Sequence, residues 1–362
     1  MITRRQSRQL HIGPVAVGGG APVSIQTMAK APPDDIDTVV QQLSAARRAG
    51  CDIARLAVPD VGAAARIREV KERSGLPIVA DIHFDHRLAV AAAAQGADAL
   101  RINPGNLTAP GALRAVSEAA GQAGIPVRVG VNAGSLPRQE GRPARQTAEN
   151  MVAAAERMVE QMRAEGFVDL KVSLKAFDLA TTVEANRLFA QRSELPLHLG
   201  ITEAGPPLSG AVRSAAALGI LLYQGIGDTV RISLSGPPEQ EVRVARVLLR
   251  ALGLRSGPVV VSCPTCGRTS ARVAELAERV ERWLDNSRLD LVVAVMGCEV
   301  NGPGEARAAD IGVAFGPRGS GLLFERGTIV ESLPNPALAK RLLERLEEVA
   351  RGRTADGQGG MD

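Results

Sequence analysis

Three cysteines in the last third of the chain have a spacing that suits metal or redox chemistry. Cys263 and Cys266 form a C-x-x-C pair, and Cys298 follows an apolar run. The thiolates of such a pair can turn toward one metal, as in zinc sites, dithiol redox pairs and iron–sulfur sites. All four histidines precede residue 200, so a histidine could complete this site only from another domain or chain. Cys51 stands apart and is expected to be a small buried side chain.

An oxygen ligand close to Cys298 could complete the set. Residues 298–305 read CEVNGPGE, and the Asn-Gly and Pro-Gly steps predict sharp turns. Glu305 is favoured over Glu299, because Glu299 would point to the other face if the strand continued past Cys298. Three thiolates and one carboxylate suit a [4Fe–4S] cluster with one exchangeable iron. A structural zinc site is the alternative.

A second group of residues with chemical potential lies on short β-branched runs before residue 236. Residues two apart in a strand share a face, and on most of these runs the shared face is polar. The same-face sets are Asp81 with His83, Arg101 with Asn103, Arg128 with Asn132, Lys171 with Ser173 and Lys175, and Arg231 with Ser233. Arg55, His198 and Glu203 lie on further runs of the same kind.

These polar faces carry an excess of positive charge. An unpaired buried charge costs several kcal/mol, so we expect these side chains to meet at a mouth that solvent can reach. The excess calls for a ligand with several negative charges, and phosphate or diphosphate is the natural candidate. The acids of the set are Asp81 and Glu203, and the cations are Arg55, Arg101, Arg128, Lys171, Lys175 and Arg231.

The elements that must position these residues alternate strand-like and helix-like segments. The strand-like runs number eight, which is the count of a (β/α)8 TIM barrel, and a doubly wound open sheet is the alternative. They cover residues 23–28, 52–58, 77–83, 99–105, 126–132, 169–176, 196–205 and 229–235.

A smaller α/β domain is expected after the barrel. Gly, Ser and Pro in residues 253–258 read as a linker, which predicts a barrel domain over residues 1–254 and a cluster domain over residues 255–351. Strands are expected over residues 259–263 and 290–298 and around 311–331, with helices over residues 270–285 and near 335–351. Residues 352–362 are expected to be a disordered tail.

Bulk composition narrows the class of protein. The chain has 362 residues, 45% of them hydrophobic and 23% charged, as in ordinary globular proteins. Its net charge of +4 comes from basic residues interleaved with acids, and aromatics make up only 2%, so nucleic-acid binding is not expected. No secretory signal and no membrane-length apolar run is seen, and a cytoplasmic protein is expected.

With these residues identified, the chain resembles the 4-hydroxy-3-methylbut-2-enyl diphosphate synthases, the GcpE (IspG) family. The likeness covers nearly all of residues 4–350. It is carried by the blocks VADIHFDHR, LRINPGN, RVGVNAGSL, LHLGITEAG, GIGDTVRISL, SCPTCGR and GCEVNGPGEA.

The resemblance implies a two-domain bacterial enzyme of the methylerythritol phosphate route to isoprenoids. Such an enzyme reduces 2-C-methyl-D-erythritol 2,4-cyclodiphosphate and expels water, with two electrons delivered singly through one [4Fe–4S] cluster per chain. Flavodoxin or ferredoxin would be the electron donor. A homodimer is implied, in which the cluster domain of one chain closes over the barrel of the other.

The resemblance also implies roles for individual residues. Glu203 would donate or relay a proton to the leaving hydroxyl, and Asn301 would hydrogen-bond the substrate beside the exposed iron. The cluster ligands would be Cys263, Cys266, Cys298 and Glu305. The diphosphate would be held by Arg55, Arg101, Arg128, Lys171 and Arg231, with Ser173 beside them, and the carbon skeleton by Asp81, Asn103, Asn132, His198 and Ser233.

One loop departs from the family pattern, and two rival functions stay open. Residues 26–32 read QTMAKAP where the family usually has a Thr-Asn-Thr type loop, so contacts implied for that loop do not carry over. A pterin-binding barrel of the dihydropteroate synthase type has a polar mouth but no use for three clustered cysteines. An iron–sulfur sensor or electron carrier would not need strands loaded with cations.

Overall fold

The chain folds into two compact units, Met1–Arg255 and Ser256–Asp362. The computed structural model describes residues 2–103, 107, 109–136, 143–266, 269, 272–287, 289–298, 304, 307–316 and 319–356, with side chains to residue 352. Asn301 and Glu305, both predicted site residues, lie outside the described residues.

The first unit is built on one sheet of eight strands, all of whose neighbouring pairs run parallel. The order around the sheet is β8-β7-β6-β5-β4-β3-β10-β9, and a bridge between Val172 and Leu197 joins β8 to β9 and closes the ring. The expected (β/α)8 barrel is thereby confirmed over the open doubly wound sheet. The strands are β3 (Ser24–Met28), β4 (Ile53–Val58), β5 (Ile78–Ile82), β6 (Ala99–Ile102), β7 (Val127–Asn132), β8 (Leu170–Lys175), β9 (His198–Leu199) and β10 (Thr229–Val230).

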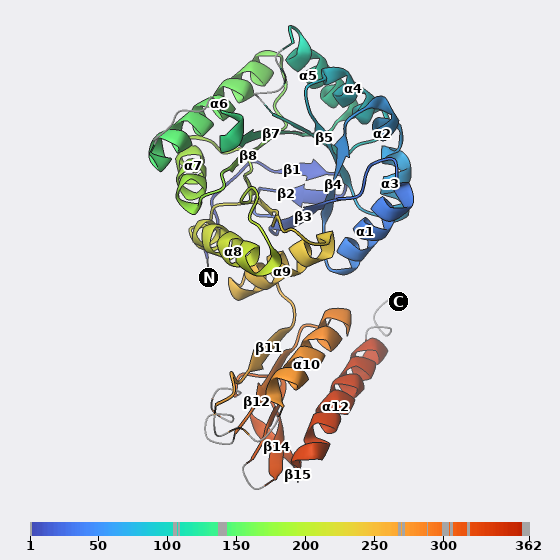
Figure 1. Ribbon diagram of the computed structural model, residues 1–362, viewed down its shortest axis with the longest axis vertical. Coiled ribbons are helices and arrows are strands. Elements are labelled where there is room, and N and C mark those ends of the chain that lie inside the picture. Colours follow the sequence, from blue (N-terminus) through green and yellow to red (C-terminus); the bar gives the residue numbers. More distant parts are fainter. Residues whose placement is uncertain are drawn as a thin grey trace. The chain divides into compact units, whose positions relative to one another are not determined.

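Helices follow the strands along the chain and surround the ring (Figure 1). Several begin at an aspartate whose side chain accepts a hydrogen bond from a backbone N–H of the first turn, as Asp35, Asp60 and Asp178 do. Their apolar faces pack on the outside of the sheet in one continuous core. The helices are α1 (Ile36–Arg48), α2 (Val61–Ala65), α3 (Ile67–Ser74), α4 (His86–Ala94), α5 (Ala112–Ala123), α6 (Ala144–Ala164), α7 (Leu179–Arg192), α8 (Pro207–Tyr223) and α9 (Pro238–Ala251), with a 3-10 turn η1 (Ala133–Ser135) after β7.

Two strands are shorter than the sequence indicates. The runs 196–205 and 229–235 form regular strand only over His198–Leu199 and Thr229–Val230. Beyond Leu199 the backbone turns toward α8, because Glu203 and Gly205 have positive φ angles of 53° and 108°. The segment after β10 turns with it, since the N–H of Ser235 bonds to the carbonyl of Gly205.

A hairpin that the sequence did not predict closes the amino-terminal end of the barrel. Its strands, β1 (Leu10–Ile12) and β2 (Val15–Val17), pair antiparallel. Leu10, Ile12 and Val17 pack against Ile53, Val79 and Ala99 at the starts of β4, β5 and β6. Solvent therefore reaches the barrel interior mainly from the opposite end, where the strands finish.

The second unit has a five-stranded mixed sheet in the order β11-β12-β13-β14-β15. The first three strands run parallel and the last pairs run antiparallel. Two helices, α10 (Val273–Ser287) and α12 (Asn335–Asp356), pack on one face and bury the apolar cluster that includes Val293, Val313 and Leu342. The strands are β11 (Val259–Ser262), β12 (Val292–Met296), β13 (Ile311–Ala314), β14 (Ser320–Glu325) and β15 (Thr328–Pro334).

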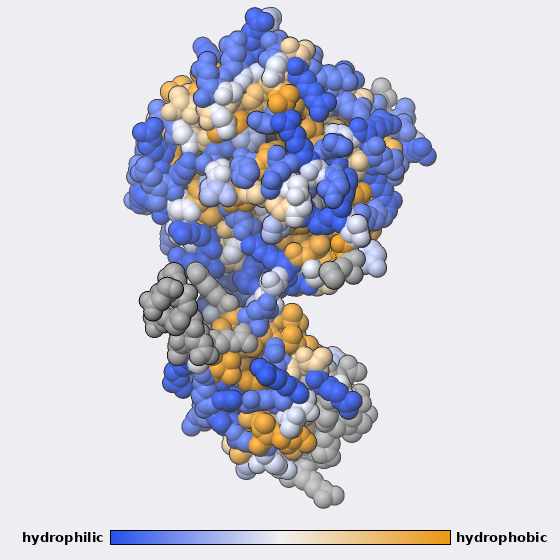
Figure 2. All heavy atoms as spheres, turned by 180° about the vertical axis from the view of Figure 1, so that it is seen from behind, coloured by the Kyte–Doolittle hydropathy of each residue, from blue (hydrophilic) through white to orange (hydrophobic). Residues whose placement is uncertain are grey.

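Hydrophilic side chains dominate the surface seen in Figure 2, with apolar patches between them. Residues 352–356, expected to belong to a tail, continue α12. Among the described helices, none is long and apolar enough to cross a membrane.

Candidate active site

A polar cavity of about 290 Å³ opens where the barrel strands end. We call it the mouth. Most of its side chains come from inward-facing positions at or just after the carboxyl ends of the strands, as in other TIM barrels. It is lined by Arg55, Asp81, His83, Arg101, Arg128, Asn132, Ser173, Lys175, Ile201, Thr202, Glu203, Arg231 and Ser233.

Asp81 is the centre of the ionic contacts on one side of the mouth. Arg101 Nη1 donates to Asp81 Oδ1 at 3.0 Å, and Arg55 Nε lies 3.7 Å from Asp81 Oδ2. His83 Nε2 lies 3.2 Å from the same Oδ2. Burial acts to raise the pKa of Asp81, but the charge of Arg55, the bond from His83 and the charge of Arg101 outweigh it and hold that pKa well below its usual range. Asp81 is therefore an ionised anchor for two arginines.

The opposite side of the mouth has cations with little negative charge near them. Burial, and then the neighbouring Arg128 and Arg231, hold the pKa of Lys175 well below its usual value. Burial and Arg55 lower the pKa of Arg231 to about 10. Arg231 has one acidic contact, since its Nη2 lies 3.8 Å from Glu241 Oε2. Each of these shifts reports a cation that would gain stability from an added anion.

Arg128 is the most enclosed of these cations. It is 3% exposed, and its Nη1 donates to His198 Nδ1 at 3.1 Å. An arginine can only donate, so His198 must carry its proton on Nε2. Burial and the charge of Lys175 hold the pKa of His198 well below its usual value, which keeps the ring neutral. Within the described part of the chain no carboxylate forms an ion pair with Arg128.

Buried donors without acceptors mark where an anion can bind. Among the described side chains, the Nε atoms of Arg101, Arg128 and Arg231 are buried and have no hydrogen-bond acceptor. A buried donor left unpaired costs about 1–3 kcal/mol. Two glycines leave room for the long side chains: a Cβ on Gly130 would lie 2.9 Å from Arg101 Nε, and one on Gly200 would lie 2.6 Å from Lys175 Nζ. The arrangement can bind a compact polyanion.

Three predicted residues do not line the mouth. Lys171 lies toward the amino-terminal end of the barrel and donates to Thr229 Oγ1 at 3.0 Å. His198 is fully buried beneath Arg128. Asn103 lines a separate cavity of about 590 Å³ beside α5 and α6. Conversely, His83 and Thr202 line the mouth without having been assigned a role. For His83 the sequence did offer a signal, because it shares a strand face with Asp81. No sequence pattern indicated Thr202.

In the second unit, two of the three cysteines lie at the ends of adjacent strands. Cys263 follows β11 directly and its N–H bonds to the carbonyl of Val295 on β12 at 3.0 Å. Cys298 lies two residues beyond β12 and is buried, whereas Cys266 is exposed. Thr269 lies beside Gly297, the residue directly after β12, because a Cβ on Gly297 would lie only 2.3 Å from Thr269 Oγ1. None of the three forms a disulfide.

The described residues alone do not complete a metal site. Within them, no three His, Cys, Asp or Glu side chains form a group that could hold a metal ion. The sheet nevertheless brings two buried or half-buried thiols to the ends of adjacent parallel strands, with the third in the connecting loop. Thr269 Oγ1, at the same place, is buried and has no partner among the described residues.

Comparisons with known proteins cover both units. The family model described as the GcpE TIM-barrel domain matches residues 7–246, and that of the GcpE protein C-terminal domain matches residues 259–348. The 4-hydroxy-3-methylbut-2-en-1-yl diphosphate synthase (flavodoxin) of Thermodesulfovibrio yellowstonii is 46% identical over 96% of this chain and 100% of its own length. The enzyme of the same name from Desulfotalea psychrophila is 47% identical, covering 96% of this chain and 97% of its own.

Solved structures add a likeness in fold alone. The dihydropteroate synthase of Yersinia pestis aligns with a TM-score of 0.51 and 17% identity, over 68% of this chain and 97% of its own. The dihydropteroate synthase of Coxiella burnetii gives a TM-score of 0.51 at 14% identity, over 66% of this chain and 94% of its own. At such identities the shared feature is the barrel, and no shared activity follows.

Proposed function

We propose that this chain, which belongs to the GcpE family, is a 4-hydroxy-3-methylbut-2-en-1-yl diphosphate synthase that acts in the methylerythritol phosphate pathway. The substrate would be 2-C-methyl-D-erythritol 2,4-cyclodiphosphate. The observation that carries the proposal within the structure is the mouth, where buried cations outnumber acids and buried donors have no acceptors. A cyclic diphosphate supplies several anionic oxygens in a compact shape, which such a site needs.

The roles of the lining residues follow from their positions. Arg128, Lys175 and Arg231 would take the diphosphate, because they have the least negative charge near them. Arg55 and Arg101 are already fixed by Asp81 and would present preorganised donors at the other edge. Asn132, Ser173 and Ser233 offer neutral hydrogen bonds for the carbon skeleton and its hydroxyls.

Glu203 is the proposed proton donor to the leaving hydroxyl. Its carboxyl group is the exposed acid in the lining of the mouth, and its backbone has a φ of 53°, a region that non-glycine residues seldom occupy. Loss of the hydroxyl as water requires a proton at that oxygen, and a carboxyl group at the rim can take a new one from solvent. Asp81 is less suited, because its arginine partners keep it ionised.

The three cysteines of the second unit fit an iron–sulfur cluster in their donor chemistry. Thiolates are the ligands that iron–sulfur clusters take. Cys263 and Cys298 follow the adjacent parallel strands β11 and β12, Cys266 lies in the loop after β11, and none of the three forms a disulfide. These three would hold a [4Fe–4S] cluster, with Glu305 as fourth ligand and Asn301 beside it, both beyond the described residues. When bound, the cluster would supply the two electrons of the ring opening one at a time.

Flavodoxin is the proposed electron donor, because it is named in the enzyme names of both relatives. A homodimer with a cross-chain active site is proposed as well. It is supported by exposed apolar side chains on the loops and helix starts that follow the barrel strands around the mouth, a surface suited to a protein cap. These are Val61, Phe84, Phe177, Leu208 and Val212.

Metal analysis tests the cofactor and separates the rivals. We expect about four irons and about four acid-labile sulfides per chain in anaerobically purified protein. Cys298→Ser should lose most of this iron while the barrel still binds diphosphate. About one zinc without sulfide, persisting after anaerobic reconstitution, would mean a structural metal site and would overturn the reductase proposal. A full cluster in a chain whose barrel does not bind diphosphate would favour the electron carrier instead.

A further inference from the structure

Backbone pairing between barrel strands is least extensive in the sector that contains β9 and β10. These strands pair with each other, and β10 with β3, over two residues each. A single bridge, between Val172 and Leu197, joins β9 to β8. By contrast, β7 and β8 pair over six residues. Yet this sector places Lys175, at the end of β8, and Arg231, directly after β10, on either side of β9, so its spacing sets the separation of these two cations.

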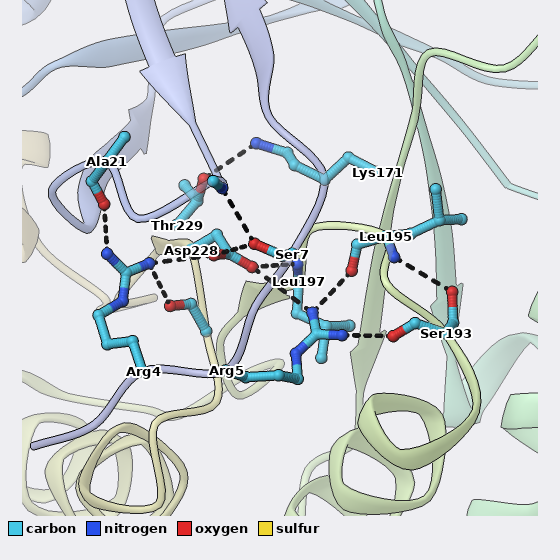
Figure 3. A network of polar contacts seen from close by, with 12 residues as sticks. Arg4, Arg5, Ser7, Ala21, Lys171, Ser193, Leu195, Leu197, Asp228 and Thr229 are labelled. Atoms are coloured by element: carbon cyan, nitrogen blue, oxygen red, sulfur yellow. Dashed lines mark hydrogen bonds and ion pairs between the residues drawn. The ribbon is translucent and has the colours of Figure 1, made fainter.

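Asp228, immediately before β10, accepts several hydrogen bonds in this sector of the barrel (Figure 3). Its carboxylate is 3% exposed. Oδ2 accepts from the backbone N–H of Leu197 at 2.8 Å, and Oδ1 accepts from Ser7 Oγ at 2.9 Å and from Arg4 Nη2 at 3.0 Å. Arg5 Nη2 lies 3.8 Å from Oδ2. One carboxylate therefore joins the start of β10, the start of β9 and the amino-terminal segment.

The amino-terminal segment also binds the loops that lead into both short strands. Arg5 Nη2 donates to the carbonyl of Leu195 at 2.8 Å, its Nη1 donates to the carbonyl of Ser193, and its backbone N–H bonds to the carbonyl of Gly225 at 2.9 Å. Arg4 Nη2 donates to the carbonyl of Gly227 at 3.2 Å. We call Arg4, Arg5, Ser7 and Asp228 together the clasp.

Thr229, next to Asp228, carries the connection across the barrel interior. Its Oγ1 accepts from Lys171 Nζ on β8 at 3.0 Å and lies 2.8 Å from Ser24 Oγ on β3. Figure 3 shows Lys171 reaching over to Thr229 beside the clasp. Lys171 thus ties β8 to β10 past the intervening β9, in the layer beneath the mouth.

We infer that the clasp closes the barrel between β8 and β10, and that Asp228 is a positioning residue that sets the separation of Lys175 and Arg231 for diphosphate binding. This rests on the proposed function, because it assumes that the mouth binds a diphosphate. Asp228 is not among the described residues that line the mouth. It acts through the backbone of β10, which continues from Thr229 into Arg231 within three residues.

Asp98 offers a matched control on the same end of the barrel. It stands directly before β6 as Asp228 stands before β10, and it is 7% exposed. Its Oδ2 accepts from the N–H of Ile78 at 2.8 Å, and its Oδ1 accepts from Lys71 Nζ at 2.8 Å. The difference is that β6 pairs over three residues with each neighbour, so its register does not depend on the carboxylate.

The test compares Asp228→Asn and Asp98→Asn in the full chain, purified anaerobically. Isothermal titration with inorganic diphosphate gives the affinity, and thermal unfolding gives the stability. Both variants should lose comparable stability, since each replaces an acceptor of a backbone N–H and of a cation by an amide. We expect Asp228→Asn to bind diphosphate about tenfold more weakly, which corresponds to about 1.4 kcal/mol, and Asp98→Asn to stay within about twofold of the wild type.

Equal affinities of the two variants would overturn the inference and leave the proposed function standing. A wild-type chain that does not bind diphosphate would overturn both. Should Asp228→Asn fail to fold, Ser7→Ala removes one hydrogen bond to Asp228 and keeps the rest of the clasp. It should weaken diphosphate binding about threefold, and unchanged affinity in Ser7→Ala would overturn the inference.

Discussion

Replacing Arg128 with methionine should make the protein more stable and a poorer binder of anions. Methionine keeps much of the side-chain volume and removes a positive charge. Arg128 is only 3% exposed, and no described carboxylate forms an ion pair with it. An effective penalty of several kcal/mol attends each buried ion. The substitution forfeits the hydrogen bond to His198 at 3.1 Å, worth about 1.5–3 kcal/mol because its donor is charged, and a weak one to Gln26 at 3.5 Å. The net expectation is a gain of about 1–2 kcal/mol in the free energy of unfolding.

The loss in binding follows from the same charge. A hydrogen bond between charged groups contributes about 1.5–3 kcal/mol, so the affinity of Arg128→Met for inorganic diphosphate should fall about 10- to 100-fold. Urea unfolding in phosphate-free buffer and isothermal titration measure the two effects. Arg73→Met is the control, because Arg73 is a surface residue paired with Asp37 and Glu69, and both quantities should change little. A less stable Arg128→Met would mean that the buried charge of Arg128 does not destabilise the fold. Wild-type affinity would mean that Arg128 does not bind the diphosphate.

Three further predictions concern neighbouring charges. Arg101→Met should lower the free energy of unfolding by about 3 kcal/mol or more, because it leaves Asp81 buried without its 3.0 Å partner; urea unfolding that shows no loss would contradict this ion pair. Burial, and then Arg128, lower the pKa of Lys171 to about 7, whereas the unfolded lysine titrates near 10.4. The unfolded state therefore holds more protons between these values, and the wild type should gain up to about 1.4 kcal/mol of stability per pH unit above pH 7 relative to Lys171→Met. A difference that is flat with pH would mean that Lys171 keeps its proton. Glu203→Gln should reduce kcat about 100-fold or more, with little change in diphosphate affinity; an unchanged kcat would assign the proton transfer elsewhere.

On most strands the sequence predicted which residues face the barrel interior, with Asn103 as an exception, but not how deep each one lies. The two-residue period places Lys171, Ser173 and Lys175 on one face of β8. With a rise of about 3.3 Å per residue, Lys171 lies about 13 Å nearer the amino-terminal end than Lys175. Lys171 therefore connects strands below the mouth, whereas Lys175 lines the mouth. Periodicity carries no information on this depth, because depth depends on strand tilt and on where each strand begins.

Other features were out of reach for different physical reasons. The hairpin of β1 and β2 has only three residues in each strand, too few for a periodic pattern to stand out. The contacts of Asp228 with Arg4 and Ser7 join residues more than two hundred positions apart. No local pattern indicates such a pair. The cysteines were easier to interpret, since their spacing alone indicated a shared ligand, and the structure brings Cys263 and Cys298 to adjacent strand ends.

Anaerobic turnover shows whether this chain catalyses the proposed reaction. The full chain would be incubated with 2-C-methyl-D-erythritol 2,4-cyclodiphosphate and chemically reduced flavodoxin, and the products separated by mass. We expect 4-hydroxy-3-methylbut-2-en-1-yl diphosphate in amounts that depend on reduced flavodoxin, with the product lost in Cys298→Ser and strongly reduced in Arg128→Met. Cyclic diphosphate that stays intact with a chain carrying its full complement of iron and sulfide would contradict the proposed function.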